Sequence, residues 1–207
     1  MASSPGQSSR PGQPGGRHRS MATRHQLLDA AAQLIAEVGW GRVTTRAVAE
    51  RAGLPHGAVS YHFHGKQELL TEAAMATVEA MFPLNRLRSV TKLTDLIPLF
   101  QASISTPPDP ETIDPVSSGV LAEAMRECGR NPELRGRITE LLRAYRTLVA
   151  DLVRAEQGRG VVERGPDATD LATLLIAAGD GLLLHALLDP QLPIAGAAEA
   201  LLALVHT

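Results

Sequence analysis

The stretch from Thr44 to Phe63, TTRAVAERAGLPHGAVSYHF, decides the fold of this chain. It reads as two short helices joined by a tight turn. Thr44 stands where a helix N-cap belongs, because its hydroxyl can accept a backbone N–H. Gly53 follows the first helix, and glycine adopts the left-handed conformation that ends helices at little cost. Pro55 then pre-sets the backbone for a second helical start, so the stretch predicts a helix-turn-helix.

The second of these helices has two different faces. Val59 and Phe63 lie four residues apart and are expected to face the core. The opposite face is small, polar and aromatic and carries no acid. Its members are Gly57, Ala58 and Tyr61, flanked by Ser60 and His62. The second helix of a helix-turn-helix enters the DNA major groove, so this face is the predicted DNA-reading surface.

About a dozen residues in this region resemble the TetR family of repressors in order and spacing. They are Gly39, Thr44, Val48, Ala49, Ala52, Gly53, Leu54, Gly57, Tyr61, His62, Phe63 and Lys66. The resemblance covers roughly residues 23 to 70. Pro55 and Ser60 depart from it, at positions where the family commonly has a capping serine and a phosphate-contacting tyrosine. The resemblance implies an all-α homodimeric repressor, bound to a near-palindromic operator and released by a small molecule.

The helix-turn-helix offers several side chains for contacts with double-stranded DNA. His56 and His62 can donate to guanine or phosphate, and Tyr61 offers a ring to a thymine methyl and a hydroxyl to phosphate. Lys66 is expected to hold a phosphate as a point charge. Residues 44–46 begin a helix, where backbone N–H groups favour phosphate. The predicted DNA-binding residues are Thr44, Thr45, Arg46, Pro55, His56, Gly57, Ala58, Ser60, Tyr61, His62 and Lys66. The alternative is that some of them only face solvent.

Charge is divided unevenly along the 207 residues. Residues 1–66 hold eight Lys and Arg against three Asp and Glu, a balance of +5, whereas the remainder has a balance of −7. A basic head on an acidic body is typical of a protein that binds DNA through the head alone. Only 3% of the residues are aromatic, and the abundance of Ala and Leu favours helices.

The first twenty residues and the cysteine content indicate where the chain works. Residues 1–20 are rich in Ser, Gly, Pro and Gln and predict a disordered tail, with a DNA-contacting basic arm as the alternative. They lack the apolar segment of a secretory signal. The single cysteine, Cys128, suits a reducing compartment. Charges or glycines interrupt the apolar runs before the ~20 residues of a membrane span. We therefore expect a cytoplasmic protein that does not enter a membrane.

The rest of the chain predicts further helices and no convincing strand. Thr23 and Gln26 can form a capping box, which places the start of the first helix at Thr23. The other expected helices span about 66–82, 91–105, 116–128, 132–156, 167–188 and 195–206, with a proline-rich loop over 106–115. The predicted domains are a tail (1–20), a helix-turn-helix head (21–66) and a helical body for ligand binding and dimerisation (67–207).

The last two helices carry more apolar surface than a single core needs. This surplus predicts a four-helix dimer interface, with a buried helix of a monomer as the alternative. The expected interface residues are Leu174, Leu175, Ala178, Leu182, Leu201 and Val205. The resemblance also implies an effector pocket in each body, lined by groups such as Phe100, Met125, Tyr145 and Leu148. Its apolar character favours a hydrophobic or amphipathic small molecule.

The sequence gives little indication of catalysis, cofactor binding or metal binding. There is no phosphate-binding glycine loop, nucleophile elbow or paired-carboxylate motif, so we expect neither an enzyme nor a bound cofactor. His56, His62 and His64 lack further ligands at metal-binding spacing. Cys128 and His185 are interpreted as packing residues. Two alternatives stay open: an all-α carrier or enzyme whose head only resembles a DNA reader, and an activator of the same fold.

Overall fold

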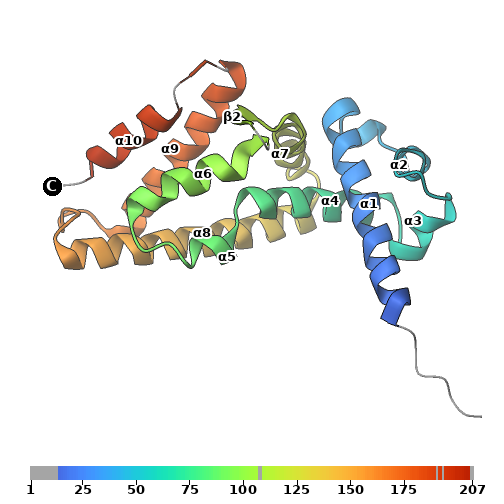
Figure 1. Ribbon diagram of the computed structural model, residues 1–207, viewed down its shortest axis with the longest axis horizontal. Coiled ribbons are helices and arrows are strands. Elements are labelled where there is room, and N and C mark those ends of the chain that lie inside the picture. Colours follow the sequence, from blue (N-terminus) through green and yellow to red (C-terminus); the bar gives the residue numbers. More distant parts are fainter. Residues whose placement is uncertain (1–13, 107–108, 190, 193, 206–207) are drawn as a thin grey trace, which may run out of the picture.

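The computed structural model describes residues 14–106, 109–189, 191–192 and 194–205. The described chain is mainly helical, with a small head at one end of a longer body (Figure 1). The elements of the head are α1 (Pro14–Val38), η1 (Trp40–Arg42), α2 (Thr45–Arg51) and α3 (Gly57–His62). Helix α4 (Lys66–Met81) follows them and runs from the head into the body (Figure 1).

The body is a bundle built around two long helices, α8 (Pro132–Arg159) and α9 (Ala168–Leu188), which pack along each other. Helix α10 (Ile194–Ala203) packs on α9 and on α6 (Leu96–Ile104). Helix α7 (Pro115–Glu127) packs against both α1 and α4 and so joins body to head. The short elements α5 (Leu84–Leu87) and η2 (Leu93–Asp95) connect α4 to α6.

The predicted starts of α2, α8 and α9 are confirmed by their caps. The helix predicted over 91–105 instead begins at Leu96, after η2, and α8 continues three residues beyond its predicted end to Arg159. The Thr44 hydroxyl accepts from the Ala47 N–H at 3.2 Å, and the Asn131 side-chain oxygen accepts from the Leu134 N–H at 3.0 Å. The Asp167 carboxylate accepts from the first turn of α9 in the same way. Gly53 has φ +66°, the left-handed conformation predicted for the turn after α2.

Helix α1 begins earlier than the sequence predicts. It starts at Pro14, and the Thr23 hydroxyl donates to the Arg19 carbonyl as in the middle of a helix. The predicted cap at Thr23 is therefore wrong, and residues 14–20 are helical. Extending an existing helix is much easier than nucleating one, so weak helix formers continue it. The rest of the predicted tail, residues 1–13, lies outside the described residues.

The predicted loop over residues 106–115 contains a short antiparallel hairpin. Strand β1 (Ser105–Thr106) pairs with β2 (Asp109–Ile113), with Ser105 opposite Ile113. Nothing in the local sequence predicted it, because the segment holds several prolines, which are rare in strands. The described chain nevertheless belongs to the all-α class that the sequence predicts.

One hydrophobic core joins the head to the body. The core residues Val48, Val59 and Phe63 of the helix-turn-helix pack in the same cluster as Leu69 of α4. That cluster also includes body residues, namely Val120 and Ala124 of α7 and Leu134 and Ile138 of α8. A movement of α7 or α8 would therefore change the packing of the head.

Gly119 of α7 packs closely against Ala36 of α1. A Cβ added at Gly119 would lie 2.8 Å from the Ala36 Cβ and 3.1 Å from its Cα. We expect Gly119→Ala to push the head away from α7 and to lower stability by about 1–3 kcal/mol, less the ~1 kcal/mol gained in helix propensity. Urea unfolding measures the change.

The matched control for this substitution is Gly136→Ala, in the interior of α8. Gly136 is exposed, and an added Cβ would meet nothing within 4 Å. The free energy of unfolding of this variant is expected to rise by about 1 kcal/mol. Equal gains in the two variants would contradict the close packing of α1 against α7.

Helix α9 is long and apolar, and its bounds agree with the helix predicted over 167–188. Its 21 residues would cross a membrane by length and composition alone. The predicted interruptions are nevertheless present, because Asp170, Gly179, Asp180 and Gly181 lie within α9. In the fold α9 packs against α8 and α10, and the core helix of a soluble protein gives the same signal.

Candidate functional site

The turn between α2 and α3 sets the position of α3 on the head. The Leu54 N–H donates to the Ala49 carbonyl at 2.9 Å, which closes the end of α2 around Gly53. The Pro55 carbonyl then accepts from the Ala58 N–H at 2.9 Å. Val59 and Phe63 are buried, as predicted, and hold the inner face of α3 on the core.

The outer face of α3 is open to solvent. Pro55, His56, Gly57, Ser60 and Tyr61 are exposed, and Tyr61 keeps 79% of its surface accessible. The His62 ring is half-buried and meets the Tyr61 ring edge-on at 4.9 Å between centroids. Ala58 differs from the prediction, because it is half-buried and packs partly against the core. A methyl group beside Val59 gains more from that contact than from solvent.

The predicted DNA-contacting residues outside α3 differ in exposure and in the hydrogen bonds they make. Arg46 is exposed, and no hydrogen bond or ion pair holds its side chain among the described residues. Thr44 is exposed but already serves as the cap of α2, and Thr45 is half-buried. The Lys66 ammonium donates to the Gly41 carbonyl at 2.9 Å, and it keeps its charge and its other donors for the predicted phosphate contact. Lys66 ties the start of α4 to η1.

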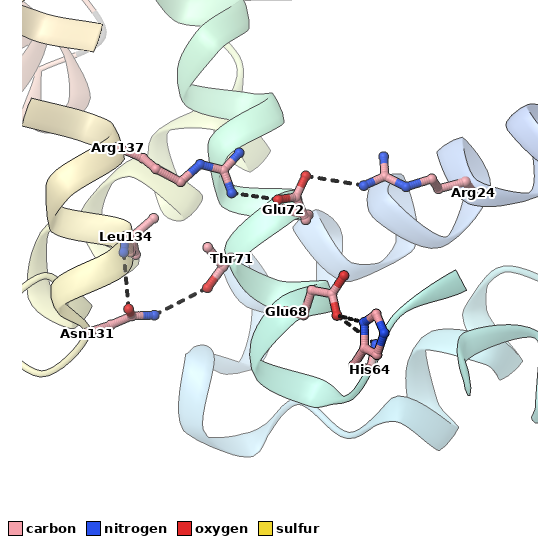
Figure 2. A network of polar contacts seen from close by, with 8 residues as sticks. All are labelled: Arg24, His64, Glu68, Thr71, Glu72, Asn131, Leu134 and Arg137. Carbon is pink, nitrogen blue, oxygen red and sulfur yellow. Dashed lines mark hydrogen bonds and ion pairs between the residues drawn. The ribbon is translucent and has the colours of Figure 1, made fainter. Parts of the chain in front are cut away.

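Sequence reasoning missed Arg24, which links three elements. Its guanidinium lies 5.0 Å from the centre of the Phe63 ring and donates to Glu72 at 3.2 Å. Glu72 of α4 also accepts from Arg137 of α8 at 2.5 Å. Figure 2 shows Glu72 between the two arginines, one from the head and one from the body. The three residues are far apart in the sequence, so no local pattern could reveal them.

Two further polar contacts of α4 appear in Figure 2. Asn131 of α8 donates to the Thr71 hydroxyl at 3.2 Å. Glu68 accepts from the backbone and the ring of His64, and these bonds hold its pKa below the usual range. His64 is thus engaged by a carboxylate, and no group of three metal-ligating side chains forms in the part of the chain that the structure describes.

Trp40 makes a second link between head and body. It is buried, and its indole N–H donates to Gln67 of α4 at 3.2 Å. Its backbone N–H donates to the Glu123 carboxylate of α7 at 2.8 Å. Glu123 also accepts from Arg126, and these hydrogen bonds lower its pKa against the opposing effect of burial. Head and body are therefore connected through charged groups on α4 and α7.

The Glu72 contacts give a prediction about acid stability. Burial alone would raise the pKa of Glu72, but Arg137 and Arg24 outweigh it and lower the pKa. A lowered pKa in the folded state stabilises the fold above the ordinary value of 4.5 and loses this effect as the pH falls through the folded-state pKa. We expect Glu72→Gln to cost about 1 kcal/mol at neutral pH.

Urea unfolding at neutral pH and in acid measures this effect. The difference between wild type and Glu72→Gln should shrink in acid, where the wild-type carboxyl is protonated. Glu140→Gln, an exposed position of α8, is the control and should change little at either pH. A difference that stays constant with pH would contradict the ion-pair explanation.

An apolar cavity lies in the body, between α4, α6, α8, α9 and α10. The space not filled by atoms is about 820 Å³, part of it open to solvent. Phe100 and Tyr145 line it, as predicted, together with Phe82. Met125 is 48% exposed and Leu148 packs in the body core, and neither lines the cavity.

The residues predicted for a dimer interface divide into three groups. Leu174 is 65% exposed, as an interface residue must be in a single chain. Leu175, Leu182 and Leu201 instead line the cavity. Ala178 and Val205 are half-buried. The exposed leucines on these two helices are Leu174, Leu184, Leu187 and Leu188 on α9 and Leu204 directly after α10. The surplus apolar surface exists, but apart from Leu174 it consists of leucines that were not predicted for the interface.

Comparisons with known sequences agree with both parts of the fold. The model of bacterial regulatory proteins of the tetR family matches residues 27–73, and that of the BetI-type transcriptional repressor C-terminal domain matches residues 105–207. The transcriptional repressor AcnR of Corynebacterium efficiens is 25% identical over 72% of this chain and 71% of its own length. With two other curated repressors the chain matches only about a third of their length.

Solved structures share the whole fold. A regulator from Saccharomonospora viridis in complex with choline has a TM-score of 0.73 at 24% identity, over 90% of this chain and 99% of its own. The regulator FadR from Bacillus subtilis in complex with stearoyl-CoA has a TM-score of 0.66 at 18% identity, over 87% and 96%. With the helix-turn-helix on a basic head and both family models in chain order, this chain belongs to the TetR family of transcriptional regulators.

Proposed function

We propose that this DNA-binding regulator is a homodimeric repressor that binds a near-palindromic operator and leaves it when a small molecule enters the body. The observation that carries the proposal is the exposed, acid-free outer face of α3. It lies within residues 1–66, whose charge balance is +5. His56, Ser60 and Tyr61 offer hydrogen-bond donors and acceptors to base edges. Arg46 offers a charge to phosphate.

The proposed dimer joins α9 and α10 of one subunit to the same helices of another. Leu174, Leu184 and Leu188 keep 65%, 59% and 78% of their surface exposed on α9. Such a contiguous apolar face is usually covered by a partner. A two-fold dimer would present two α3 helices to successive major grooves, about 34–36 Å apart. This spacing supports a near-palindromic operator.

The proposed effector is a hydrophobic or amphipathic small molecule held in the body cavity. The lining is apolar apart from a few groups, which is typical of small-molecule sites. A ligand releases DNA only if it binds one arrangement of the heads better than the other. The cavity lies beside α4, which contacts both head and body, so a change in α4 would reach α3. Because the target is bacterial DNA, we place the protein in the cytoplasm.

Selection from a random-sequence duplex library tests the DNA-binding proposal. The purified protein should enrich a near-palindrome and bind it with nanomolar affinity. Binding should weaken steeply with salt, because several phosphate contacts release counterions. Enrichment of no sequence, and binding equal to that of random DNA, would favour the carrier or enzyme alternative. A reporter gene placed behind the selected operator then separates a repressor from an activator.

A further inference from the structure

Among the described residues that line the body cavity, Asp180 is the one that carries a charge. It lies on α9 beside Gly179, and both residues line the cavity. Its residue surface is exposed although it lines the cavity, which places it where the cavity opens. Among the described residues no Lys, Arg or His forms an ion pair with Asp180. Partial desolvation by the cavity walls raises the pKa of Asp180, and no neighbouring charge within the described chain offsets this effect.

Aromatic rings stand in the same cavity as this carboxylate. The Tyr145 and Phe82 rings meet edge-on at 5.4 Å between centroids, and Phe100 lies in the same lining. Tyr145 is close enough to Asp180 for the carboxylate to raise the pKa of its phenol, after the larger effect of burial. Aromatic faces attract cations, and they do so more strongly when water is excluded.

We propose that the effector is an organic cation with an apolar body, bound with its positive charge against Asp180 and the Tyr145 ring. The inference rests on the proposed effector cavity and names the chemical class of its ligand. A neutral apolar molecule would fill the same space but leave the Asp180 charge uncompensated. An anionic molecule would be repelled by it.

Two probes of the same shape separate the effect of the positive charge from the effects of shape and size. Phenyltrimethylammonium and tert-butylbenzene differ only in a nitrogen cation in place of a carbon atom. Calorimetric titration without DNA should show that wild type binds the cation at least about tenfold more tightly. In Asp180→Asn the cation should lose about tenfold in affinity, whereas tert-butylbenzene should bind as before. Far-UV circular dichroism checks that this isosteric variant is folded.

Glu199→Gln is the matched control, because it removes one negative charge from α10 at an exposed position outside the cavity lining. It should keep the preference for the cation. The inference is overturned if the cation does not bind at millimolar concentration, if both probes bind wild type equally, or if Asp180→Asn keeps the preference. It is also overturned if Asp180→Asn weakens only the dimer, measured by sedimentation.

A separate measurement distinguishes this inference from the proposed repressor function. The cation is added to the complex of wild-type protein with its selected operator. Charge-selective binding that leaves the operator complex intact would uphold the ligand class and contradict release by ligand. Release by tert-butylbenzene at least as effective as release by the cation would uphold the repressor function and overturn the ligand class.

Discussion

Replacing Tyr61 by alanine is expected to weaken operator binding by about 1–3 kcal/mol, roughly tenfold or more, without loss of stability. Tyr61 is 79% exposed on the outer face of α3, so its side chain contributes little to the core. The free energy of unfolding, measured by thermal denaturation, should therefore stay within about 0.5 kcal/mol of wild type. Fluorescence anisotropy with the selected operator, at fixed salt, measures the affinity.

Two further variants make this test specific. Tyr61→Phe keeps the ring and removes the hydroxyl, so it separates contact with a thymine methyl from a hydrogen bond to phosphate. Met125→Ala removes a large exposed side chain from α7, 48% exposed and away from α3, and should leave DNA binding unchanged. Unchanged operator affinity in Tyr61→Ala would show that the outer face of α3 does not read DNA through this residue.

Replacing Leu184 by glutamate is expected to convert the dimer to monomers. Leu184 is 59% exposed on the apolar face of α9. Because a two-fold interface contains the same residue from both subunits, the substitution would place two glutamates in it. A carboxylate buried there without a partner is costly. Sedimentation velocity should show half the wild-type mass. A monomer engages one half-site only, so operator affinity should fall by roughly 100-fold or more.

The control for this substitution is Thr147→Glu, at an exposed position of α8. It introduces the same charge and should leave both the mass and the DNA affinity unchanged. If Leu184→Glu remains a dimer with full affinity, the interface lies on another surface. If it becomes a monomer but binds DNA as before, the dimer is not required for operator binding.

The helix-turn-helix could be predicted from the sequence because its signals act over a few residues. The Thr44 hydroxyl caps α2 at Ala47, three residues away, and the left-handed conformation of Gly53 depends on the residues next to it. Asn131 caps α8 over the same short range. Such contacts depend only on the residues beside them. The outer face of α3 followed from these starts and stops together with helical periodicity.

The positions of side chains between elements could not be predicted in this way. Lys66 bonds to Gly41, 25 residues away, and Arg24 meets Glu72 at a separation of 48. Leu175 and Leu182 turned out to line a cavity, although their apolarity fits a dimer interface equally well. Apolar residues on a helix show that a surface is covered, but not by what.

The sequence by itself therefore determined the all-α class, the helix-turn-helix and most of the residues that α3 presents, since local hydrogen bonds and periodicity suffice for these. Only the tertiary structure decided how the head is attached and where the cavity lies. The Glu72 contacts and the place of Asp180 depend on how α4, α8 and α9 lie relative to their neighbours. That arrangement results from the packing of whole faces, to which residues far apart in the chain contribute together.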